Sequence, residues 1–140
     1  MLASCSTDMN IKLWNMQTFT VQKTLTGHEH EVSGLAWIPQ HQDFLLSCGR
    51  EPSIRVWDTI SGTCIVAITQ GLQDWIKRVA VSSSGNLFCS ASDQIIVWST
   101  EQVLARGSDP TQAIQVTLDE HEHQVDCITW ASEASARTIE

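Results

Sequence analysis

Two stretches of this sequence carry the same pattern: residues 28–37 read HEHEVSGLAW, and residues 121–130 read HEHQVDCITW. Three further segments also resemble one another: LASCSTDMNIKLWN from Leu2, LLSCGREPSIRVWD from Leu45 and LFCSASDQIIVWS from Leu87. Their tryptophans follow at spacings of 43 and 41 residues: Trp14, Trp57 and Trp98. Self-similarity at a fixed period restricts a chain to folds that stack one structural unit repeatedly.

The repeated unit is predicted to be made of β-strands. An alternating apolar strand leads into each repeat tryptophan (IKLW, IRVW or IIVW), and a strand rich in Ser and Cys lies upstream of it. Short runs of β-forming residues recur along the chain with no convincing helix pattern. Ten of these runs are predicted as strands: 20–26, 32–38, 43–48, 53–58, 64–69, 76–82, 87–92, 94–99, 113–118 and 125–131. Four strands per period of about 42 residues is the spacing of propeller blades.

The order of residues within a period resembles the WD-repeat β-propeller family: Gly-His, then Ser in a strand, Asp in a turn, and Trp-Asp. In that family, His, Ser, Asp and Trp form a buried hydrogen-bonded chain that holds each blade together. The resemblance assigns that structural role to Ser4, Asp8 and Trp14 of blade one, to His28, Ser47, Glu51 and Trp57 of blade two, to Ser90, Asp93 and Trp98 of blade three, and to His121. Leu72 takes the histidine place in blade three, so that chain is expected to be incomplete.

Within the WD-repeat proteins, the sequence most resembles the lissencephaly family of propellers. Three segments carry this resemblance: ASCSTDMNIKLW, DWIKRV and EHEHQVDCITWASEAS. Members of the lissencephaly family regulate cytoplasmic dynein and also form the non-catalytic subunit of platelet-activating-factor acetylhydrolase. The resemblance implies a partial all-β propeller with about three of seven four-stranded antiparallel blades. Expected boundaries are 1–26, 27–70 and 71–119 for the three blades, 120–134 for the start of another, and 135–140 for a tail.

Such a chain would be a fragment, an isoform or an incomplete gene model, and we expect it not to be independently stable. Self-association would need the N-terminal helices of the family, which do not occur in this sequence. Blade three differs in two respects: its central hairpin is two residues shorter, and about nine extra residues near 103–113 are expected to form a polar loop. A two-residue loss should leave the strand facing the same way, because side chains alternate with period two.

Composition limits the choice of partner and compartment. A net charge of −8 and a pI near 4.9 argue against nucleic acid as the main partner. No apolar stretch is long enough for a membrane span, and the N-terminus does not resemble a signal peptide. Five cysteines without a CxxC pair indicate reduced thiols packed between blades in a cytosolic protein. By resemblance, the chain is placed in the cytoplasm, associated with the cytoskeleton and centrosome.

Two residue patterns could indicate metal binding or catalysis instead of a structural role. The H-x-H pairs His28/His30 and His121/His123 are spaced like metal half-sites, but each lacks a local third ligand. The Ser, His and Asp of each blade resemble a catalytic triad, yet they repeat in several blades and are expected to be buried, where they serve structure. We therefore expect no metal, no cofactor and no catalytic residue.

Trp75 is the tryptophan that the repeat does not explain. It takes the place held by Glu31 and Gln124 in the other copies, in a loop with Lys77 close by. Trp and Arg are enriched in protein-binding hot spots. In the lissencephaly propeller this place carries a Trp and a basic residue that contacts the dynein motor. The resemblance passes that role to Lys77 and Trp75, and a second basic contact to Arg50. The alternative is a partly packed Trp among solvated charges.

The sequence therefore predicts a non-enzymatic scaffold that binds and regulates the cytoplasmic dynein motor and its adaptors. Through that role it would serve microtubule-based transport, nuclear migration, spindle positioning and cell division. The alternative is another WD-repeat adaptor, such as a substrate-recognition subunit of a ubiquitin ligase. Upstream sequence would separate the two, because dimerisation helices favour the dynein regulator and an F-box favours the ligase. A hydrolase would require an exposed nucleophile in a pocket.

Overall fold

The computed structural model describes residues 1–105 and 109–132. Eleven strands in this part of the chain form three antiparallel sheets. The first sheet has three strands: β1 (Leu2–Cys5), β2 (Ile11–Asn15) and β3 (Thr20–Leu25). The second has four: β4 (Val32–Ile38), β5 (His41–Gly49), β6 (Ile54–Asp58) and β7 (Thr63–Ile68). The third also has four: β8 (Arg78–Val81), β9 (Leu87–Ala91), β10 (Ile95–Ser99) and β11 (Ile114–Leu118).

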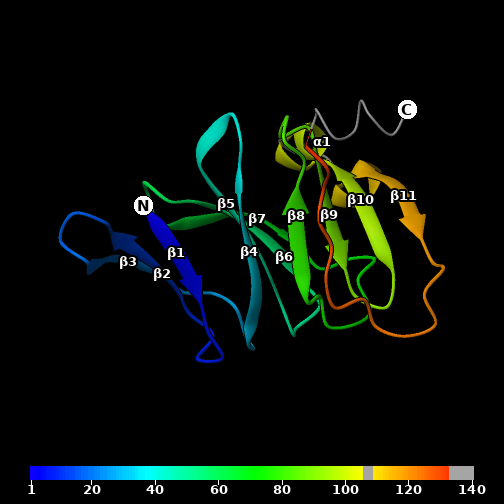
Figure 1. The fold of residues 1–140 in the computed structure, drawn as a ribbon, viewed down its shortest axis with the longest axis horizontal. Helices are drawn as coiled ribbons and strands as arrows, with labels where there is room; N and C mark the ends of the chain where they lie inside the picture. Colours follow the sequence, from blue (N-terminus) through cyan, green and yellow to red (C-terminus); the bar gives the residue numbers. More distant parts are fainter. Residues whose placement is uncertain (106–108, 133–140) are drawn as a thin grey trace.

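The sheets stand side by side like successive propeller blades (Figure 1). In the two complete sheets, chain order and spatial order agree, with β4 and β8 as the inner strands and β7 and β11 as the outer ones. The inner strand β4 contacts β1 of the first sheet on one side and the inner strand β8 on the other. The prediction of an all-β, partial WD-repeat propeller is confirmed.

The core lies between neighbouring sheets rather than within one of them. Trp57 of β6 packs with apolar side chains of β2, β3, β4 and β5 between the first and second sheets. A larger cluster between the second and third sheets includes Trp98, Phe88, Leu46 and Ile54. Each sheet therefore buries an apolar face against the next, as stacked repeats require.

The shortened hairpin of blade three keeps its strands in the expected orientation. Ile95 of β10 lies opposite Ala91 of β9, and three residues, 92–94, make the turn. The Ser92 N–H donates to the Gln94 carbonyl across it at 2.9 Å. No residue of this turn has a positive φ, so the loss of two residues is accommodated without left-handed backbone.

The prediction of a polar loop near 103–113 is wrong for the part that the structure describes. After β10 the chain forms a short helix, α1 (Thr100–Leu104), and a 3-10 turn follows at Pro110–Ala113. Val103 and Ala113 are 4% and 0% exposed and belong to the larger core cluster. The insertion packs against the blades because it carries apolar side chains at these two places. Residues 106–108 lie outside the described part.

The strand predicted over 125–131 is also absent. The segment after β11 runs back across the third sheet (orange to red in Figure 1), but it pairs with no strand of the described chain. A strand needs a neighbour to accept its backbone hydrogen bonds. Residues 133–140, which include the expected tail at 135–140, are outside the described part. Neither short helix approaches the length or apolarity of a membrane-spanning helix, among the residues described.

Candidate functional site

The structure brings Arg50, Trp75 and Lys77 together, and we call these three residues the Trp75 cluster. Arg50 comes from the turn after β5, whereas the other two precede β8. The Arg50 guanidinium carbon and the Lys77 Nζ each lie 5.5 Å from the centroid of the Trp75 ring. At this distance a cation is attracted to the aromatic face. Residues 27 positions apart in sequence therefore form one aromatic and basic surface.

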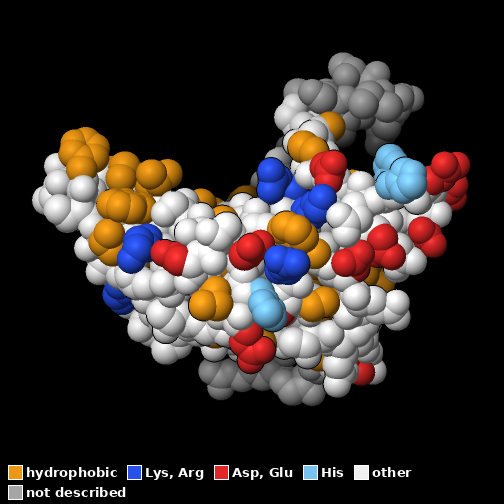
Figure 2. Space-filling view, turned by 90° about the horizontal axis from the view of Figure 1, so that it is seen from below, with side chains coloured by type: hydrophobic (Ala, Val, Ile, Leu, Met, Phe, Trp, Pro, Cys, Tyr) orange, Lys and Arg blue, Asp and Glu red, His pale blue; other side chains and the backbone are white. Residues whose placement is uncertain are grey.

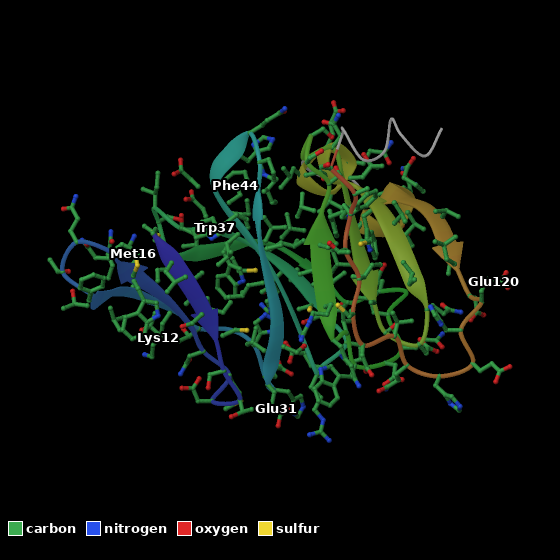
Figure 3. The ribbon with its side chains drawn as sticks, viewed as in Figure 1. Lys12, Met16, Glu31, Trp37, Phe44 and Glu120 are labelled. Atoms are coloured by element: carbon green, nitrogen blue, oxygen red, sulfur yellow. The ribbon has the colours of Figure 1, made fainter. Side chains whose placement is uncertain are left out.

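The cluster lies beside Glu31, which is 3.8 Å from Arg50 and is labelled in Figure 3, at the end of the molecule that carries the turn between β5 and β6. Figure 2 looks onto that end and shows Lys and Arg side chains beside Asp and Glu near its middle. The protein carries a net charge of −8, so this basic patch is local. Such a patch favours a defined orientation of an acidic or mixed partner surface over general attraction.

Trp75 and its neighbour Ile76 are held in place by hydrogen bonds to two strands of the second sheet, β4 and β5. Its Nε1 donates to the Ser33 Oγ at 3.1 Å, and that hydroxyl donates to the Ile76 carbonyl at 2.6 Å. The Ile76 side chain is 1% exposed, and its N–H donates to the Gly49 carbonyl at 3.2 Å. The loop is therefore anchored at the indole nitrogen and at the backbone of the next residue, which lowers the entropy lost when a partner binds.

Acidic side chains contact both cations of the cluster. Lys77 Nζ lies 2.7 Å from the Asp126 Oδ1, with the lysine side chain 27% and the aspartate 77% exposed. A hydrogen bond from Lys77 lowers the pKa of the Asp126 carboxyl below its usual range. Arg50 is 3.8 Å from Glu31 and is 58% exposed. Lys77 is thus more enclosed than Arg50, and its ammonium is already partly neutralised.

Blade two contains a continuous chain of side-chain hydrogen bonds. Trp57 Nε1 donates to the Ser47 Oγ at 2.9 Å, and the same oxygen is 2.7 Å from the His28 Nε2. The other ring nitrogen of His28 contacts the Glu51 carboxylate. Glu51 also accepts from the Ser53 hydroxyl at 2.9 Å. Buried polar groups that would otherwise be unpaired are satisfied in this way.

The directions of the pKa shifts indicate which groups in this hydrogen-bonded chain carry a proton. Burial lowers the pKa of His28 below 6.5, and hydrogen bonding to Glu51 only partly opposes it. Burial acts to raise the pKa of Glu51, but hydrogen bonds from His28 and Ser53 outweigh it and lower the pKa. His28 is therefore neutral beside an ionised carboxylate at pH 7. Its Nδ1–H donates to Glu51, and its Nε2 accepts the Ser47 hydroxyl proton.

The other blades contain only part of this arrangement among the described residues. Trp14 donates to the Ser4 Oγ at 2.9 Å, and Trp98 donates to the Ser90 Oγ at 3.0 Å. Leu72 packs against the apolar core where blade two has its histidine. The remaining polar positions assigned to the blades are exposed: Asp8, Asp93 and His121. Asp8 accepts a hydrogen bond from the Asn10 N–H and so stabilises the turn between β1 and β2.

The cysteines are free thiols. Burial raises the pKa of Cys48 to about 12 and also raises the pKa of Cys5 and Cys89, which disfavours the reactive thiolate. No group of three His, Cys, Asp or Glu side chains placed to hold a metal ion occurs within residues 1–105 and 109–132. His121 and His123 are exposed, whereas the His28 ring is used by the chain of blade two.

Two residues of the site, Ser33 and Asp126, were not predicted from the sequence. Ser33 supports the Trp75 ring from β4, but a serine in a strand has many other uses. Asp126 reaches Lys77 across 49 positions of sequence. Its location follows from the way the segment after β11 crosses the third sheet, which the repeat pattern does not specify in atomic detail.

The comparisons with known proteins agree with this geometry. The WD domain, G-beta repeat family matches residues 19–58. The chain is 34% identical over 142 residues to the nuclear distribution protein nudF of Aspergillus niger, covering 99% of the chain and 30% of the relative. It is 31% identical over 145 residues to the nuclear distribution protein PAC1 of Arthroderma otae, covering 96% of the chain and again 30% of the relative.

A third relative, the nuclear distribution protein PAC1 of Candida dubliniensis, is 30% identical over 138 residues and is covered to 27% of its length. The chain thus spans about 30% of the length of the relatives it matches. Three features of the chain are typical of WD repeats: the blade-like sheets, the hydrogen-bonded Trp-Ser pairs and the matched repeat. Residues 19–58 match the WD-repeat family, and the chain is similar over nearly its whole length to the nuclear distribution proteins.

Proposed function

We propose that this chain is part of a non-catalytic WD-repeat scaffold that binds and regulates the cytoplasmic dynein motor. The proposal extends to microtubule-based transport, nuclear migration and spindle positioning, and to a location at the cytoskeleton and centrosome. Its similarity to proteins named for nuclear distribution supports a role in positioning nuclei. The observation that carries the motor contact is the Trp75 cluster, with a cation on the ring from each of two loops.

The cluster is suited to a protein surface that is acidic at its centre. Trp75 offers a flat, anchored apolar face, and Arg50 and Lys77 supply charges that can pair with carboxylates. Trp and Arg contribute most to binding when such contacts become buried. The long basic side chains also steer a partner of opposite charge as it approaches.

We expect the combined changes Arg50→Ala and Lys77→Ala to weaken binding of a dynein motor domain by about tenfold or more, since both charged contacts are lost. Binding is measured by titrating the motor domain against the immobilised complete propeller of which this chain is proposed to be a part. The matched control is Lys12→Ala with Lys23→Ala, which removes the same charge from the first sheet. Unchanged binding of the Arg50/Lys77 variant, or an equal loss in the control, would remove the site assignment.

Asp126→Asn should act in the opposite direction. The aspartate competes with an acidic partner for the Lys77 ammonium, so neutralising it should strengthen motor binding by about two- to fivefold. The same titration at two salt concentrations measures the effect, which salt should reduce. Asp119→Asn is the control, because it removes one charge from an exposed residue that hydrogen-bonds Gln94 instead. A gain of affinity cannot be produced by misfolding, so this variant complements the alanine pair.

A further inference from the structure

Blade three contains a small cavity at the place where blade two has its histidine ring. The cavity measures about 120 Å³ and is mostly enclosed. One wall is the loop before β8, at residues 71–73, and the other is the turn between β9 and β10, at residues 92–94. This loop and this turn lie at the same end of the third sheet (Figure 1). The buried Ile96 side chain of β10 also lines the cavity.

The cavity forms because blade three departs from the repeat at two facing positions. In blade two, the equivalent loop and turn are bridged by His28, which donates its Nδ1–H to the Glu51 carboxylate. Leu72 replaces this histidine in blade three and packs against the apolar core instead. The facing turn is two residues shorter, and it carries Asp93, with a shorter side chain, at the place of Glu51. A hydrogen-bonded ring is thus replaced by a polar space.

The walls of the cavity favour a cation that donates hydrogen bonds. They contain one carboxylate, Asp93, and no basic side chain among the residues that the structure describes. Asp93 is exposed, and within the described chain its carboxylate accepts a side-chain hydrogen bond only from its neighbour Ser92, at 3.1 Å. The Gln94 Nε2 donates to Asp119 at 3.2 Å, so the oxygen of that amide remains as an acceptor. Negative charge and acceptor groups therefore dominate this space.

A guanidinium group fits this space better than an ammonium group does. It is planar, like the imidazole that fills the equivalent place in blade two, and its N–H groups can donate to several acceptors at once. An ammonium group is a strongly hydrated point charge, so it loses more hydration when it enters a mostly enclosed space. Because about 10–15 Å³ suffices for one water molecule, the cavity has room for the head of an arginine side chain.

We propose that this cavity, which we call the Asp93 pocket, holds the guanidinium group of an arginine side chain supplied by a partner protein. The guanidinium pairs with the Asp93 carboxylate as the His28 ring pairs with Glu51 in blade two. The pocket lies beside the Trp75 cluster, because Gln73 and Trp75 belong to one loop, but its charge is opposite. An arginine at the matching place on a partner therefore fixes its orientation. The proposal does not depend on the dynein motor being that partner.

Methyl NMR of the complete propeller of which this chain is proposed to be a part tests the pocket with a model ligand, N-acetylarginine methylamide. The methyl signals of Leu72 and Ile96, which line the pocket, should shift and saturate with a Kd on the order of 1–10 mM. The matched ligand is N-acetylcitrulline methylamide, which keeps the planar shape without the charge and should bind about tenfold more weakly. N-acetyllysine methylamide should bind about fivefold more weakly.

Asp93→Asn should weaken binding of the arginine compound by about tenfold, because it removes the charge and keeps the shape of the side chain. Asp93 is exposed, so the variant should fold, and unchanged methyl signals away from the pocket would confirm that it does. Asp8→Asn is the control, since it removes the same charge from the equivalent turn of blade one and should leave binding unchanged. No saturable shift at Leu72 and Ile96, equal binding of the citrulline or lysine compound, or equal effects of the two aspartate variants would each overturn the proposal.

Discussion

Replacing Trp57 with alanine should lower the free energy of unfolding by about 3–5 kcal/mol, the range for removing a buried aromatic side chain. Trp57 is 1% exposed and fills the core between the first and second sheets. Its indole N–H also donates to Ser47, so the change breaks the end of the hydrogen-bonded chain of blade two. Urea unfolding followed by far-UV circular dichroism, at one fixed protein concentration, measures the loss.

Trp14→Ala is the matched control for Trp57→Ala. Trp14 has the same place in its repeat and makes the same bond to a serine, but its side chain is only half-buried. We expect less than half the loss of stability, because the energy of a core side chain scales with the apolar surface it removes from water. Equal losses would show that the repeat position, rather than burial, sets the cost.

The sheets were predictable from sequence because two independent patterns agree on them. Alternation of apolar residues marks single strands, and the spacing of Trp14, Trp57 and Trp98 sets the period. A register error of one residue would turn every buried side chain outward, so the pattern strongly restricts the pairing. The strands observed in blade two, from β4 to β7, begin and end within two residues of their predicted bounds.

The insertion and the segment 125–131 were mispredicted for different reasons. Ser99 and Asp109 cap the two short helical turns, and Pro110 opens the second, but these local signals span too few residues to predict a helix. Residues 125–131 have the composition of an inner strand and are docked like one. What they lack is a neighbouring edge, and strand formation depends on that neighbour as much as on the sequence itself.

The Trp75 cluster could be predicted in part. A break in the repeat singled out Trp75, and the family resemblance added Arg50 and Lys77; the structure places all three within reach of one another. The contact of Lys77 with Asp126 could not be predicted, since nothing in a single sequence reports which of its many acidic residues will lie opposite a given lysine. Whether the cluster binds a motor stays a prediction.

His28→Leu should lower the free energy of unfolding at pH 7 by about 1–3 kcal/mol. The ring is buried, and its loss leaves Ser47 and Glu51 each without one hydrogen-bond partner. Leucine is a suitable replacement because Leu72 packs at the corresponding place in blade three. His30→Leu is the control, since it makes the same substitution two residues away on an exposed side chain and should change stability little.

The same variant tests the protonation state of His28. Burial lowers its pKa below 6.5 in the folded chain, so the unfolded chain binds a proton that the folded chain does not as the pH falls below that value. Wild-type stability should therefore decrease with acidification from pH 6.5 to the lowered pKa of His28, by at most about 1.4 kcal/mol per pH unit. Glu51, whose pKa lies below 4.5 in the folded chain, adds a further decrease at lower pH.

In the His28→Leu variant the decrease that begins at pH 6.5 should be absent, and His30→Leu should retain it. Urea unfolding at a series of pH values between 7 and 5 separates the two outcomes. If His28 were instead held as a cation by Glu51, its pKa would be raised, and wild-type stability would fall as the pH rose through that pKa. A decrease on the alkaline side that His28→Leu removes would therefore show that the carboxylate outweighs burial, and the proton order along blade two would have to be reversed.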